Sequence, residues 1–174
     1  DQAEIARAML EGFRLTGRER YARAAEGTLS FVSRELTHDG GGFFSTLDAR
    51  SGGEEGTYYV WTPEQVRDAL GDGTAADLFC DRYGVTERGN FEDGRTVLTV
   101  SATLDELAEA YDMTPTEVSE TLTSARERAF EVREGRTRPA RDEKVLAGWN
   151  GLMISTFAEG ALTFGDDHAE TAAE

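Results

Sequence analysis

The sequence predicts a mainly α-helical protein that is interrupted by one aromatic β-hairpin. Apolar residues recur at helical spacing over most of the chain. Two Thr-Pro dipeptides, followed by Gln65 and Glu117, are typical helix starts. Only residues 42–62 combine aromatic and β-branched side chains as strands do. These observations predict at least two αα-hairpins and no large sheet.

The expected helices follow in chain order. Ile5, Met9 and Phe13 predict a first helix over about 2–15. A second helix over 21–36 follows a short turn, and the pair forms an αα-hairpin. The later helices are expected at 63–70, 75–83, 104–111 and 115–132, with a last one from Val145 or Trp149 to Phe164.

The predicted hairpin has strands at 42–47 and 57–61 and a long polar tip between them. A further short strand is expected over 96–100. Gly89 and Asn90 indicate a turn in a packed connecting loop.

The tip of this hairpin is a candidate sugar site. Asp48, Glu54 and Glu55 are candidate acid/base groups, because carboxylates accept sugar hydroxyls or move their protons. Tyr59, Trp61 and, later in the chain, Trp149 are candidate platforms, because aromatic rings stack on the apolar face of a pyranose. The alternative is a solvated acidic tip on a hairpin with an aromatic core.

Lys144 is the only lysine among 18 basic residues, and it lies in a dense charged stretch, 138–144. A lysine that remains in so arginine-rich a chain suggests a role that arginine cannot fill. We expect its ammonium to be partly buried and paired with a carboxylate; the candidates are Asp142, Asp48, Glu54 and Glu55.

The same stretch supplies further candidate binding residues. Arg141 and Lys144 can bind an anionic group or hydroxyls, and Asp142 is a further candidate substrate-binding residue. Trp149 and Asn150 open the following helix, where backbone N–H groups are free. The alternative is a structural ion network that ties a loop to helix ends.

The charge of the chain excludes some partners. It carries 34 acidic and 18 basic residues, a net charge of −16. Repulsion from phosphates argues against nucleic acid and anionic membranes as partners. This composition is typical of haloarchaeal proteins, which fold in molar salt that screens such repulsion.

Other features predict a cytoplasmic protein without metal or cofactor. No apolar run reaches the length of a membrane span, and residues 1–15 resemble an amphipathic helix rather than a leader peptide. Cys80 is the only cysteine and is expected to act as a small core residue. His38 and His168 have no metal-ligand spacing, and no nucleotide-binding fingerprint is present.

Both ends suggest a fragment of a longer protein. The first helix begins without a cap, and Asp166 and Asp167 resemble the cap of a helix that does not follow. No Ser- or Pro-rich linker divides the chain, so we expect residues 1–174 to form a single unit.

Four motifs together resemble one known family. They are Gly-Gly-Phe-Phe-Ser-Thr-Leu-Asp-Ala at 41–49, Glu-Glu-Gly-Thr-Tyr-Tyr-Val-Trp-Thr at 54–62, the turns within 83–92, and the stretch from Arg138 to Met153. In this order they resemble the spermatogenesis-associated protein 20 family, also called YyaL-type thioredoxin-domain proteins. The resemblance covers nearly the whole chain.

The resemblance implies a fold and two functions. Family members carry a thioredoxin-like domain followed by an (α/α)6 toroid similar to sugar epimerases and six-hairpin glycosidases, and this chain resembles roughly the first half of the toroid. The first expectation is a carbohydrate-binding or carbohydrate-active domain, an isomerase, epimerase or hydrolase whose fragment alone is inactive. The alternative is a non-catalytic scaffold that serves the attached thioredoxin-like domain. Related epimerases use histidines, and neither His38 nor His168 is placed for that role.

Overall fold

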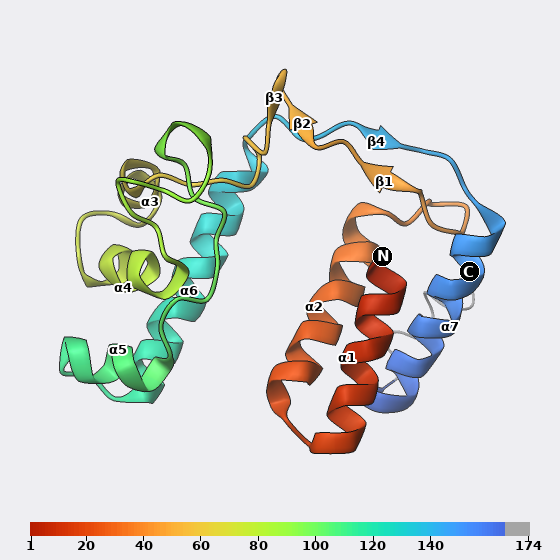
Figure 1. Cartoon of the computed structure of the whole chain (residues 1–174), viewed down its shortest axis with the longest axis horizontal. Coiled ribbons are helices and arrows are strands. Elements are labelled where there is room, and N and C mark those ends of the chain that lie inside the picture. Colours follow the sequence, from red (N-terminus) through yellow and green to blue (C-terminus); the bar gives the residue numbers. More distant parts are fainter. Residues whose placement is uncertain (166–174) are drawn as a thin grey trace. The chain divides into compact units, whose positions relative to one another are not determined.

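The computed structural model describes residues 1–165 and is mainly helical (Figure 1). Its α-helices are α1 (Gln2–Thr16), α2 (Glu19–Glu35), α3 (Pro63–Leu70), α4 (Thr74–Tyr83), α5 (Leu104–Tyr111), α6 (Pro115–Glu134) and α7 (Ala147–Phe164). A short 3₁₀ helix, η1, spans Glu92–Gly94. The strands are β1 (Thr46–Leu47), β2 (Arg50–Ser51), β3 (Glu54–Glu55) and β4 (Arg141–Asp142). Every predicted helix is present, with ends within two residues of those expected, so the helical class is confirmed.

The chain folds into two compact units. Among the described residues, unit 1 comprises residues 1–48 together with 141–165, and unit 2 comprises residues 49–140. No Ser- or Pro-rich composition marks residues 48 or 141, so the division into units has no signal in the sequence. The toroid stays a prediction.

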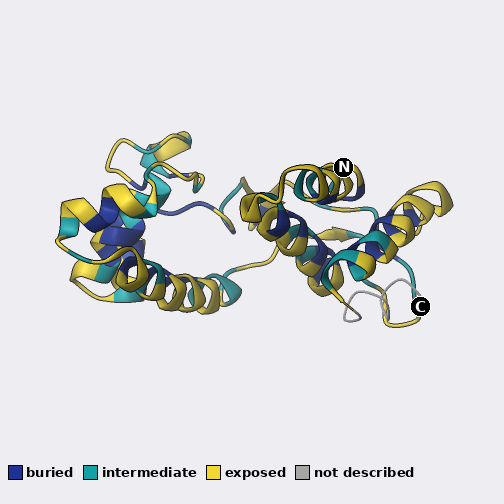
Figure 2. Ribbon diagram, turned by 90° about the horizontal axis from the view of Figure 1, so that it is seen from below, coloured by how far each residue is buried: buried dark blue, intermediate teal, exposed yellow. Residues whose placement is uncertain are grey.

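Unit 1 is a bundle of three helices capped by a short strand pair. α1 and α2 form the predicted αα-hairpin, and α7 packs against both. Ala6, Leu29, Val32 and Phe157 are fully buried between the helices, and the buried residues lie on their facing sides (Figure 2). Unit 1 therefore takes its core from segments more than one hundred residues apart.

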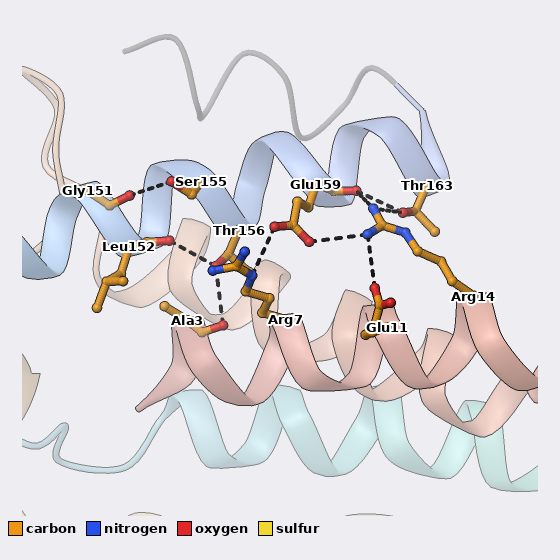
Figure 3. Close-up of polar contacts among 10 residues, drawn as sticks. All are labelled: Ala3, Arg7, Glu11, Arg14, Gly151, Leu152, Ser155, Thr156, Glu159 and Thr163. Carbon is orange, nitrogen blue, oxygen red and sulfur yellow. Dashed lines mark hydrogen bonds and ion pairs between the residues drawn. The ribbon is translucent and has the colours of Figure 1, made fainter.

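Polar contacts also join α1 to α7 (Figure 3). The Glu159 carboxylate forms ion pairs with Arg7 at 3.0 Å and with Arg14 at 3.3 Å. The Thr156 hydroxyl donates to the carbonyls of Ala3 and Leu152. α7 is thus fixed along the length of α1 by both apolar and polar contacts.

Unit 2 is built around α6, the longest helix. α3, α4 and α5 each pack on it. One cluster gathers around Trp61 and Phe79, and a second around Leu78 and Leu122. Cys80 is half-buried against the first cluster, as expected, and burial raises the pKa of its thiol.

The predicted aromatic hairpin is wrong in its pairing. β2 pairs with β3, with Ser51 opposite Glu54, so the hairpin is smaller and lies inside the expected polar tip. Gly52 and Gly53 both have positive φ, which a two-residue hairpin loop requires and glycine permits. The aromatic residues that follow the hairpin form a turn instead of a strand. The Gly56 carbonyl accepts hydrogen bonds from the N–H groups of Tyr59 and Val60.

The two outer segments of the expected hairpin pair elsewhere. β1 pairs with β4 in unit 1, with Thr46 opposite Asp142. Trp61 makes a single bridge to Thr96, so the strand expected over 96–100 is reduced to one residue. Aromatic and β-branched residues favour extended backbone at these positions, but they do not select the partner strand.

Candidate functional site

A cavity of about 510 Å³ lies in unit 1 where α1 and α7 begin. We call it the helix-end cavity. Its apolar wall is formed by Leu36, Phe43, Phe44 and Met153, and its polar side includes Gln2, Glu4, Ser45 and Thr46. Trp149 and Asn150 also line it. Its size is within the range of small-molecule sites.

Asn150 holds the aromatic wall in place. Its Oδ1 accepts from the Phe43 N–H at 2.6 Å, and its Nδ2 donates to the Phe43 carbonyl at 3.0 Å and to the Leu146 carbonyl at 3.1 Å. The amide is therefore occupied by backbone groups. Gly42 has φ +86° and lies so close that a Cβ there would be 3.2 Å from Asn150 Oδ1. The predicted ligand-binding residue Asn150 thus shapes the cavity rather than offering its amide to it.

Trp149 is the most available aromatic group of the cavity. It lies in the first turn of α7 and is 58% exposed. α7 begins without a side-chain cap and has no acidic residue in its first turn. Trp149 therefore presents an indole face in the first turn of the helix, whereas the N–H of Asn150, which was expected to be free, donates to the Leu146 carbonyl.

Arg141 and Asp142 build the edge of unit 1. The Arg141 guanidinium lies 4.1 Å from the Phe44 ring centroid and donates to the Glu35 carbonyl and the Glu143 carboxylate. The Asp142 carbonyl accepts from the N–H and the hydroxyl of Ser45. These contacts fit the alternative of a structural network between a loop and helix ends.

Lys144 is paired as predicted but is not buried. Its Nζ lies 2.7 Å from Asp142, and its side chain is 72% exposed. This pair, together with the Lys144 N–H, lowers the pKa of Asp142. The expectation of a partly buried ammonium is wrong, because Lys144 lies two residues after Asp142, the last residue of β4, and the two exposed side chains can pair without leaving water.

The three candidate acid/base carboxylates fall in different units. Asp48 ends the first segment of unit 1 and is not among the residues that line the helix-end cavity. Glu54 and Glu55 form β3 in unit 2. Glu54 is 3.2 Å from Arg95 and lines a second cavity, described below.

The two candidate platforms of the hairpin differ in burial. Trp61 is only 2% exposed, and the Arg136 guanidinium covers its ring at 4.1 Å. Tyr59 is partly exposed and meets Tyr58 edge to face. Trp61 is therefore a core residue of unit 2 whose faces are occupied by protein.

Sequence reasoning missed the contribution of α1 to the site. Gln2 and Glu4 line the helix-end cavity although they are distant in sequence from Trp149. In the sequence, these two residues were recognisable only as part of the polar face of an amphipathic helix. Such a face does not indicate which segment it will contact.

No metal site is evident among residues 1–165, where no group of three His, Cys, Asp or Glu side chains gathers. His38 Nδ1 accepts from the Gly40 N–H, and its ring meets Phe44. His168, Asp166 and Asp167 lie outside the described residues. Within the described part, no helix is long and apolar enough to cross a bilayer.

Comparison with known proteins supports the resemblance seen in the motifs. Spermatogenesis-associated protein 20 is 38% identical in Homo sapiens over 96% of this chain, 35% in Mus musculus over 91%, and 32% in Rattus norvegicus over 99%. The matches cover 24%, 23% and 25% of these proteins. The chain therefore spans about a quarter of the length of the relatives it matches. No protein-family model matches the chain.

Proposed function

We propose that unit 1 binds a neutral carbohydrate in the helix-end cavity. The observation that carries this proposal is Trp149, an exposed indole on the rim of a cavity of about 510 Å³. Sugars bind to protein through an aromatic face on one side and hydrogen-bonding groups on the other. Gln2, Glu4 and the Ser45–Thr46 segment supply the second kind of group.

The apolar wall of the cavity suits the apolar face of a sugar ring. Phe43 stacks on Phe157 with centroids 5.3 Å apart and planes 5° apart, and Asn150 fixes its backbone. The wall is therefore held in place before a ligand arrives, which lowers the entropic cost of binding.

Turnover by this chain alone is not part of the proposal. Acid/base catalysis needs two groups within hydrogen-bond reach of the substrate. Asp1 and Glu4 are the carboxylates that line the cavity, whereas the predicted acid/base groups Asp48, Glu54 and Glu55 do not line it. We propose that isomerase, epimerase or hydrolase activity, where present, belongs to the longer protein.

Trp149 fluorescence provides the test. Because Trp61 is buried, a neutral sugar in the helix-end cavity should change mainly the Trp149 emission. Titration with a panel of neutral mono- and disaccharides should give saturable changes for at least one, and Trp149→Ala should abolish binding measured by calorimetry. Leu162→Ala is the control, since Leu162 is an exposed α7 residue that does not line the cavity. Equal binding by the Trp149→Ala protein, or no binding by the unchanged chain, would refute the proposal.

A scaffold role for an attached thioredoxin-like domain is the second candidate. Its support is the apolar surface of α7 and the segment before it. The exposed apolar residues there are Val145, Leu146, Trp149, Leu152, Ile154 and Leu162. Exposed apolar residues gathered on one segment can mark an interaction site.

Binding to the thioredoxin-like domain of a relative tests this second role. We expect Ile154→Glu and Leu162→Glu to weaken that complex in a sedimentation assay while leaving sugar binding unchanged, because neither residue lines the helix-end cavity. Ala158→Glu, also on α7, is a third variant that should weaken the complex. Arg128→Gln in unit 2 is the control.

A further inference from the structure

A second cavity, of about 410 Å³, lies within unit 2 beside the β2–β3 hairpin. We call it the hairpin cavity. Gly52 and Glu54 of the hairpin, Gln65 of α3, and Arg95 and Arg136 line it. All of its lining residues fall between 51 and 137, so the site is complete within unit 2.

Arg136 is the unusual member of this set. Its Nη1 donates to the carbonyls of Val60 at 2.7 Å, Tyr58 at 3.2 Å and Thr57 at 3.4 Å. Its guanidinium also stacks on Trp61. These contacts fix the side chain in one place and use one of its nitrogens.

No carboxylate of residues 1–165 forms an ion pair with Arg136. This is notable in a chain with 34 acidic residues, where Arg95, Arg133 and Arg141 each have a carboxylate partner. Burial and the nearby charge of Arg133 both lower the pKa of Arg136. A half-buried cation held by carbonyls and an aromatic ring, with no carboxylate among the described residues, is electrostatically incomplete, and an anion would complete it.

The other groups of the cavity fit a hydroxylated anion. Gln65 uses its Oε1 to accept from the Thr62 N–H, which leaves its Nε2 as a donor. The Thr57 hydroxyl donates to the Ser51 carbonyl and retains lone pairs as acceptors. Arg95 is held by the carboxylates of Glu54 and Asp93. Glu54 is exposed, with 69% of its side chain accessible, so it can move aside.

The geometry points to the hairpin cavity as a binding site for a small hydroxylated anion, a carboxylate or phosphate group held by Arg136 with Gln65 beside it. The anchored guanidinium supplies two donors without further ordering, and charge-assisted bonds of this kind are the strong ones. Glu54 occupies Arg95 when the site is empty and limits the affinity. This site is separate from the proposed carbohydrate site of unit 1.

The test uses the whole chain and three probes: inorganic phosphate, D-glucuronate and neutral D-glucose. Binding is followed by calorimetry and by the side-chain Nε–Hε signal of Arg136 in NMR spectra. We expect phosphate, glucuronate or both to bind and to shift this signal, and glucose not to shift it. Binding of phosphate alone identifies a phosphate site, and binding of glucuronate alone identifies a carboxylate site.

Two variants with opposite expected effects separate binding from folding. Arg136→Gln should lower the affinity for the anion about 10-fold or more, since it removes a charge-assisted interaction. Glu54→Gln should raise the affinity for the anion several-fold, since it removes a negative charge and releases Arg95. Glu54 is exposed, so this second variant remains informative where Arg136→Gln fails to fold. Arg128→Gln, on the exposed part of α6, is the control and should bind as the unchanged chain does.

Two results would overturn the inference. One is the absence of any shift of the Arg136 signal by phosphate and glucuronate. The other is anion binding that Glu54→Gln does not strengthen or that a folded Arg136→Gln protein retains in full.

Discussion

The two units differ in how their helices begin. In unit 2, α3, α5 and α6 each start with a complete capping box, formed by Thr62 with Gln65, Thr103 with Glu106, and Thr114 with Glu117. In unit 1, α1, α2 and α7 all start without a side-chain cap. Unit 2 is specified largely by local signals, whereas unit 1 depends on contacts between distant segments. We therefore expect the two units to respond differently to the same truncation, substitution or change of salt.

Separating the segments of unit 1 should have the largest effect. We expect residues 49–140 alone to fold cooperatively, because their core and their caps are internal. Residues 1–48 alone should not, because Met153 and Phe157 of α7 complete their core. Circular dichroism and NMR dispersion of both fragments measure this. A peptide of residues 141–165 should restore structure to 1–48, and a well-folded 1–48 alone would contradict the contrast.

Two asparagines with the same bonding pattern test burial against exposure. Asn150 binds both the N–H and the carbonyl of Phe43, and Asn90 in unit 2 binds both groups of Val97. Asn150→Leu should lower the free energy of unfolding by about 3–5 kcal/mol, because it leaves two buried backbone groups unpaired.

Asn90→Leu is the matched variant and should cost about 1 kcal/mol, because water can replace the bonds to Val97 in an exposed loop. Urea denaturation of both proteins measures the difference. Similar losses for the two variants would show that burial does not govern the cost.

Salt should stabilise unit 2 more than unit 1. Residues 49–140 carry 19 acidic and 10 basic side chains, whereas the described residues of unit 1 carry 11 and 8. Screening relieves self-repulsion, so the melting temperature of the 49–140 fragment should rise in molar KCl. Thermal melts in dilute buffer and in KCl measure this, and an unchanged or lower value in KCl would contradict the salt-adapted interpretation of the composition.

Removing a cap should have a smaller effect confined to unit 2. Thr103→Ala and Thr114→Ala should each lower the free energy of unfolding by about 1 kcal/mol. Thr28→Ala, within α2, is a control whose hydroxyl bonds only within its own helix. Losses as small as that of the control would show that the caps do not specify unit 2.

The same caps predict a pH dependence. Hydrogen bonds from Thr103 and Thr114 lower the pKa of Glu106 and Glu117. A lowered pKa in the folded state means that the stabilisation is present above the unfolded pKa and is lost as pH falls through the folded value. NMR titration should show both carboxyls ionising below their ordinary range, and Thr→Ala should return each toward it.

Lys144→Ala should have the smallest effect of all. The Lys144–Asp142 pair is exposed, and such pairs contribute little to stability. The midpoint of urea denaturation should be unchanged, while the pKa of Asp142 should rise toward its ordinary value. A marked loss of stability would restore the buried-pair interpretation of this lysine.

Several features were predictable because their causes are local. The Thr-Pro starts of α3 and α6 place a cap, a proline and a glutamine or glutamate within four residues, and the structure forms these caps. Exposure of Trp149 at a helix start and the pairing of Lys144 with Asp142 also follow from near neighbours. The candidate site was predictable to that extent.

The features that the sequence did not predict depend on contacts between segments that are distant in sequence. The burial of Trp61 beneath Arg136, the bond between Asn150 and Phe43, and the pairing of β1 with β4 join segments at least 75 residues apart. Sequence periodicity states that a side chain will be buried, but it does not state against what. A charged residue likewise gives no sign of whether its partner is a carboxylate or, as at Arg136, a set of carbonyls.

The sequence by itself determined the helical class, the helix ends and the acidic character of this protein, because capping, periodicity and charge act over a few residues. Tertiary packing was needed to divide the chain into two units, to bring Asn150 to the wall of a cavity, and to place Arg136 over Trp61 with no carboxylate of residues 1–165 paired to it. Those outcomes depend on which distant groups satisfy each buried polar atom, and that is settled only when the whole chain packs.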